Sequence, residues 1–71
     1  MTYKTKVQEY WYQYIENSNE QWRYGQCLFN TLHMVSPDKA ELVRGVRGLD
    51  PFNDETKETI GAFILWINKN L

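Results

Sequence analysis

The sequence predicts an all-α fold, a compact bundle of four short helices, and two observations support this prediction. Apolar residues recur every three or four positions in four separate segments, which is the spacing of a buried face on a helix. No segment alternates apolar and polar residues for long enough to indicate a β-strand. The 71 residues are enough for one domain, 1–71, with a small core, because a chain of this size buries only about 60% of the surface that it exposes when unfolded.

The first helix is predicted at about residues 6–17. Val7, Tyr10 and Tyr14 lie on one side of this segment, together with Trp11. Thr5 precedes the segment and Gln8 follows three residues later, which matches a capping box. We therefore expect the helix to begin directly after Thr5.

The second helix is predicted at about residues 19–35, and Ser18 with Gln21 gives a second match to the capping box. Gly25 lies inside this segment, although glycine in a helix interior costs about 0.5–1 kcal/mol relative to alanine. Such a glycine is tolerated more readily where another group must approach closely. The stripe on one side of the helix is formed by Gly25, Leu28, Phe29, Leu32 and either Val35 or Ser36.

The third helix is predicted at about residues 37–46, directly after Ser36. Pro37 disfavours helical geometry at the preceding residue and suits the first position of a new helix. The fourth helix is predicted at about residues 55–70, with Asn53 or Asp54 as its N-cap. Its apolar stripe is formed by Ile60, Phe63, Ile64, Ile67 and Leu71.

The residue types needed for several kinds of site are scarce. Cys27 is the only cysteine and His33 the only histidine, so the chain offers neither an internal disulfide nor a zinc cluster. The two residues are six positions apart on one predicted helix, and at about 100° per residue they point in different directions. They cannot act together as nucleophile and base. We therefore predict a protein that is not an enzyme and takes no metal and no cofactor.

The formal net charge of −1 gives no overall attraction to nucleic acid or to an anionic membrane. The longest apolar stretch is far shorter than the ~20 residues of a membrane span, and the N-terminus lacks the apolar region of a secretory signal. We therefore expect a cytoplasmic protein with no membrane partner. A local basic patch of Lys39, Arg44 and Arg47 leaves one alternative, a nucleic-acid-binding accessory protein. The acids in "PDKAE" disfavour a DNA-reading role for the third helix.

Polar residues form a second face on the predicted second helix, at Arg23, Gln26, Asn30 and His33. Such a face is commonly solvated, but a structural role is the alternative that we prefer. Arginine pairs with carboxylates through two hydrogen bonds, and asparagine both donates to and accepts from backbone. We predict that Arg23, Gln26 and Asn30 clamp the "LDPF" loop, with Arg23 paired preferably to Asp50 and Asn30 bonded to loop backbone. A ligand-binding surface remains the other interpretation.

Aromatic residues make up 15% of the chain, more than one core face easily hides. Tyrosine and tryptophan are enriched at the hot spots of protein interfaces. The candidate protein-interaction residues are therefore Trp11, Tyr12, Ile15 and Trp66. The sequence leaves open whether these side chains belong to the core or to an interface, and whether the protein forms a homodimer.

The pattern RYGQ…FN…P…RG…DPF…F…W resembles that of short, uncharacterised proteins encoded by tailed bacteriophages and prophages. The resemblance implies a phage origin and action in the cytoplasm of the infected bacterial host. Small early phage proteins often bind a host protein, so it also implies a protein-interaction module that modulates an unknown host partner. The matching residues are Arg23, Tyr24, Gly25, Gln26, Phe29, Asn30, Pro37, Arg44, Gly45, Asp50, Pro51, Phe52, Phe63 and Trp66.

Overall fold

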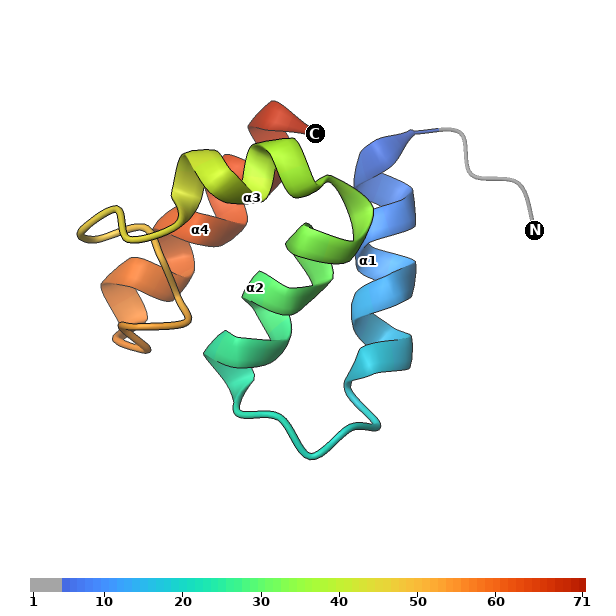
Figure 1. Ribbon diagram of the computed structural model, residues 1–71, viewed down its shortest axis with the longest axis horizontal. Helices are drawn as coiled ribbons and strands as arrows, with labels where there is room; N and C mark the ends of the chain where they lie inside the picture. Colours follow the sequence, from blue (N-terminus) through green and yellow to red (C-terminus); the bar gives the residue numbers. More distant parts are fainter. Residues whose placement is uncertain (1–4) are drawn as a thin grey trace.

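The computed structural model describes residues 5–71 and shows an all-helical, compact arrangement, as the sequence predicts (Figure 1). The four helices in this part of the chain are α1 (Lys6–Asn17), α2 (Tyr24–Val35), α3 (Pro37–Val43) and α4 (Lys57–Asn70). In Figure 1, α1 and α2 run in opposite directions, and α3 follows α2 after a sharp turn. No strand is found between residues 5 and 71.

The start of α1 is as predicted, but the start of α2 is not. Thr5 Oγ1 accepts a hydrogen bond from the Gln8 N–H at 3.1 Å, as expected for an N-cap. The predicted capping box at Ser18 is wrong, because Ser18 ends α1 instead: its hydroxyl donates to the Ile15 carbonyl at 2.6 Å. α2 consequently begins at Tyr24 rather than near residue 19.

The other two helices are shorter than predicted. α3 ends at Val43 rather than 46, and the chain then turns through Gly45, whose φ of 73° lies in the left-handed region that glycine adopts freely. α4 begins at Lys57 rather than 55, because Thr56 is its N-cap. Thr56 Oγ1 accepts from the Thr59 N–H at 3.4 Å.

Asp54 supports this N-cap rather than forming it. Its Oδ1 accepts from the Thr56 N–H at 3.1 Å, and its Oδ2 accepts from the Thr59 hydroxyl at 2.8 Å. These hydrogen bonds, the one from the Thr59 hydroxyl above all, hold the pKa of the Asp54 carboxyl below its usual value. The ionised carboxylate is therefore favoured in the folded state.

The hydrogen bonds of Asp54 predict how the free energy of unfolding changes as the pH falls. A lowered pKa in the folded state adds stability above the pKa of the unfolded chain, and that stability is lost as the pH falls through the lower folded value. We expect Asp54→Asn to be less stable at pH 7 and to lose less stability on acidification below about pH 4. Urea unfolding across this pH range checks it, with Asp38→Asn as the exposed control. Parallel pH profiles for Asp54→Asn and the unmodified protein would contradict it.

The core lies between α1, α2 and α4 and is closed by α3. Ala40 and Val43 are the residues of α3 that face the core, whereas Leu42 is 66% exposed. The core cluster consists of Tyr10, Leu28, Phe29, Leu32, Val35, Ala40, Val43, Phe63 and Ile67.

Tyr10 is the largest fully buried side chain among residues 5–71. Its hydroxyl donates to the Leu28 carbonyl at 2.7 Å and thereby joins α1 to α2. Burial raises the pKa of this hydroxyl, so it stays protonated and able to donate. We expect Tyr10→Phe to keep the packing and to lose about 1 kcal/mol of unfolding free energy with this bond.

Urea titration with fluorescence detection tests the Tyr10 prediction. Tyr24→Phe is the matched control, because its ring is 53% exposed and water replaces any lost hydrogen bond. The control is expected to change stability by less than about 0.5 kcal/mol. Equal effects of the two substitutions would show that the Tyr10 hydroxyl contributes nothing to the contact between α1 and α2.

Candidate functional site

The segment 44–56, here called the DPF loop, packs against the first turn of α2. The Gly25 N–H, one of the amides that an α-helix leaves unpaired at its start, donates to Glu55 Oε1 at 2.7 Å. A Cβ on Gly25 would collide with the Pro51 carbonyl oxygen and would lie 2.7 Å from Glu55 Cγ. The prediction of a close approach at Gly25 is thus confirmed, and the group that approaches is backbone of the DPF loop.

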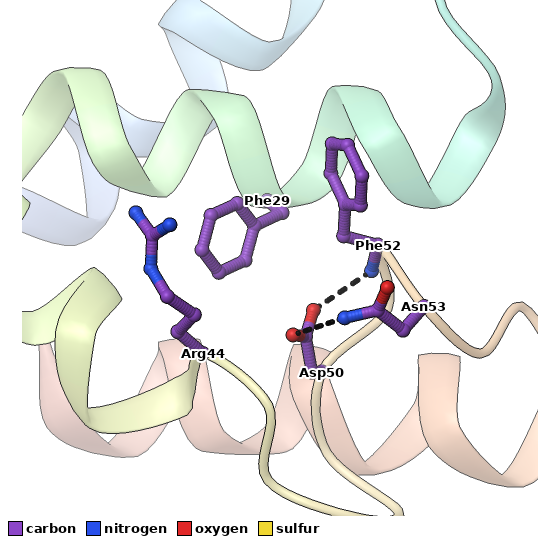
Figure 2. Close-up of a pocket in the computed structure, with 5 residues that line it drawn as sticks. All are labelled: Phe29, Arg44, Asp50, Phe52 and Asn53. Atoms are coloured by element: carbon purple, nitrogen blue, oxygen red, sulfur yellow. Dashed lines mark hydrogen bonds between the residues drawn. The ribbon is translucent and has the colours of Figure 1, made fainter.

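Asp50 organises the DPF loop from inside. Asp50 is only 3% exposed and accepts three hydrogen bonds, two of which Figure 2 shows. Oδ2 accepts from the Gly45 N–H at 2.7 Å and from Asn53 Nδ2 at 3.0 Å, and Oδ1 accepts from the Phe52 N–H at 2.9 Å. These bonds tie both ends of the turn to one carboxylate.

The predicted clamp is wrong in its specific contacts, although Arg23 does meet the DPF loop at Phe52. Arg23 does not pair with Asp50, whose carboxylate is buried and already holds three donors; its guanidinium lies over the Phe52 ring, 5.9 Å from the centroid. Gln26 Oε1 accepts a hydrogen bond from the Arg23 N–H at 3.3 Å, so the Gln26 side chain caps the start of α2 and does not hold the loop. Asn30 is half-buried and bonds no loop backbone among residues 5–71.

A pocket of about 200 Å³ opens beside this loop (Figure 2). The rings of Phe29 and Phe52 meet edge to face with 5.9 Å between centroids, and the Arg44 guanidinium lies 5.6 Å from the Phe29 centroid. The carboxylate at its base is occupied by the loop's own donors, and the volume is below the roughly 300–1,000 Å³ typical of small-molecule sites. The pocket is therefore explained by the packing of the DPF loop on α2. It is lined by Phe29, Arg44, Asp50, Phe52 and Asn53.

Cys27 and His33 lie apart, as their spacing predicts. Cys27 is buried and burial raises the pKa of its thiol, which disfavours the reactive thiolate. His33 is exposed on the polar side of α2. This geometry places neither residue to activate the other.

The outer side of α1 presents apolar side chains. Ile15 is 64% exposed and Tyr12, three residues earlier, is 38% exposed. Trp11 is half-buried beside them: its ring meets Tyr10 edge-on with 4.8 Å between centroids, and its Nε1 donates to Asn68 Oδ1 of α4 at 3.0 Å. We call Trp11, Tyr12 and Ile15 the α1 surface.

Trp66 does not belong to the α1 surface. It is half-buried on α4 and packs against the core. It precedes Asn68, the partner of Trp11, by two positions, which is about 200° around a helix. The four candidate residues therefore divide into three on one surface and one elsewhere.

Sequence reasoning missed a neighbouring exposed ring. Tyr24 is more than half exposed, and its ring lies edge-on to Tyr14 of α1, with 6.4 Å between centroids. It escaped notice because the predicted second helix began too early and placed Tyr24 within the helix rather than at its first residue. The Arg-Tyr-Gly sequence, with a second large ring at Trp22 before it, was the available signal in the sequence.

Of the three basic residues in the alternative nucleic-acid patch, Lys39 and Arg44 contact different partners within the fold. Lys39 Nζ donates to the Asn70 carbonyl at the end of α4, at 2.6 Å. Arg44 pairs with Glu41 at 3.1 Å, and Arg47 is exposed. Two of the three cations thus have partners within the fold.

Within residues 5–71, no three His, Cys, Asp or Glu side chains are grouped to hold a metal ion. No helix in this part of the chain is long and apolar enough to span a membrane. No family model matches the sequence, and comparisons with curated proteins and with solved structures give no match either.

Proposed function

We propose that this protein is a small, non-enzymatic, phage-encoded interaction module that binds a host protein in the cytoplasm of the infected bacterium. The observation that supports this most directly is the α1 surface, where Ile15 is nearly two-thirds exposed on a helix whose opposite side is core. A large apolar side chain held in water on an ordered helix is typical of a binding surface when others adjoin it.

The α1 surface has the properties of an anchor. Trp11 is fixed by its hydrogen bond to Asn68, so little side-chain entropy is lost when a partner covers its exposed edge. Covering Ile15 fully contributes roughly 1.5–3 kcal/mol. Glu16 is exposed next to Ile15 and lies one turn after Tyr12, so a partner with basic groups at its rim is favoured.

Affinity capture from a lysate of the host bacterium tests this function. The tagged protein is expected to retain a specific host protein, and Ile15→Lys is expected to lose it while its helical circular dichroism is unchanged. Leu42→Lys is the matched control, because Leu42 is similarly exposed but lies on α3. If Ile15→Lys retains the same proteins as the control, the α1 surface is not the binding site.

The alternative role in nucleic-acid binding is distinguished by its salt dependence. Contacts to phosphates make affinity fall steeply as salt concentration rises. We expect no binding to duplex DNA or to RNA at ~50 mM salt. Binding that weakens with salt, and that weakens further in Arg47→Ala, would replace the present proposal.

A further inference from the structure

The outer side of α4 presents an exposed leucine next to a glycine, whose missing side chain leaves open space on the helix surface. Leu65 is 72% exposed, the most of any large apolar side chain in residues 5–71. Gly61 lies one turn earlier, and nothing within 4 Å would meet a Cβ there. Glycine weakens a helix interior. Because a side chain at position 61 would meet no other group, the packing of the monomer does not explain why glycine is found there.

We propose that the α4 helices of two copies of this chain pair in antiparallel orientation through this face. A two-fold axis near residue 63 places Leu65 of each copy over Gly61 of the other. The side chain that protrudes from one helix then fills the gap in its partner. Such a self-complementary contact is the kind that two-fold dimers form.

Two charged residues on the same face of α4 favour a second copy of the chain as the partner and favour the antiparallel orientation. Glu58 and Lys69 are eleven residues apart, which is about 16 Å along the helix and within about 20° around it. Leu65 lies between them, and both charged residues are exposed. Neither forms an ion pair with another residue in 5–71, where the pairs are Lys6–Glu9 and Glu41–Arg44.

The two-fold axis that matches Leu65 with Gly61 also brings Glu58 of one copy next to Lys69 of the other. An antiparallel pair therefore gains two ion pairs, whereas a parallel pair would place Glu58 against Glu58. The antiparallel arrangement also opposes the two helix dipoles. Shape and charge thus indicate the same partner in the same register. This face adjoins the α1 surface at Asn68, which accepts the hydrogen bond of Trp11. It is formed by other residues than the α1 surface, so the dimer does not require the proposed host partner.

Sedimentation equilibrium between about 10 μM and 1 mM tests the dimer, since a single helix pair forms a small and weak interface. The unmodified chain is expected to dimerise in this range. Leu65→Lys is expected to weaken the dimer about a hundredfold or more. Leu42 is similarly exposed but lies on α3, and Leu42→Lys is expected to leave the dimer unchanged. A chain that stays monomeric throughout, or a Leu65→Lys variant that dimerises normally, overturns the proposal.

Charge reversal tests the register. Glu58→Lys and Lys69→Glu each place like charges together at both ends of the pair, so each alone is expected to dimerise about tenfold more weakly at low salt. A mixture of the two variants restores opposite charges at both ends and is expected to form a heterodimer of near-normal affinity. If the mixture associates no better than either variant alone, the antiparallel register is overturned.

Discussion

Gly25→Ala is expected to destabilise the fold by about 3 kcal/mol, although it adds a single methyl group. The added Cβ would overlap the Pro51 carbonyl, which is backbone and cannot rotate away as a side chain could. Moving the DPF loop outward would also break the hydrogen bond from the Gly25 N–H to Glu55, which is worth more than an ordinary one because its acceptor is charged. Urea unfolding monitored by circular dichroism measures the loss.

Gly61→Ala is the matched control for this substitution. Gly61 also lies in a helix, but no atom stands where its Cβ would be. At a protein concentration of a few μM, where a weak dimer dissociates, we expect Gly61→Ala to gain about 0.5–1 kcal/mol from helix propensity. The same mutation is thus expected to have opposite signs at the two sites. A Gly25→Ala variant as stable as the unmodified protein would show that the loop does not rest on α2.

Asp50→Ala is expected to have a similarly large effect, a loss of about 3–4 kcal/mol. Hydrogen bonds to charged groups contribute about 1.5–3 kcal/mol each when taken singly, and their losses overlap when one residue makes several. The Gly45 and Phe52 amides and the Asn53 side chain would all lose their acceptor. Asp50→Asn is expected to recover only part of the loss, because its amide group would face one of these donors.

Asp38→Ala provides the comparison, since Asp38 is an exposed acid in the first turn of α3. Only a helix-dipole contribution of about 0.3–1 kcal/mol is expected there. Amide chemical shifts from NMR locate the effect: changes in Asp50→Ala should concentrate in residues 44–56. Equal stability of the two alanine variants would contradict the anchoring role of Asp50.

The helices could be predicted from sequence because their signals are local. The 3.6-residue repeat at Phe63 and Ile67 and the Ser36-Pro37 boundary depend on residues within a few positions. The start of α2 could not be predicted, because Ser18 matches a helix start as well as the helix end that it actually forms. Sequence rules that consider only neighbouring residues do not decide whether the Ser18 hydroxyl begins one helix or ends another.

The candidate site was predictable in position and less so in its contacts. Arg23 and Gly25 do meet the DPF loop, and Asp50 is central to it. Which donors reach Asp50 depends on the turn at Gly45, and that geometry excludes Arg23 from the carboxylate. Trp11 shows the same limit, because whether its ring is fixed depends on Asn68, 57 positions away.

The hydrogen bond from Gly25 to Glu55 also bears on how the molecule folds. One amide in the first turn of α2 is capped by a residue 30 positions downstream, so that turn is complete only when the C-terminal third has docked. A fragment ending before Glu55 would fray at Tyr24. The amide protons at the start of α2 and those of the DPF loop are therefore expected to exchange with solvent as one cooperative unit, with the same opening free energy.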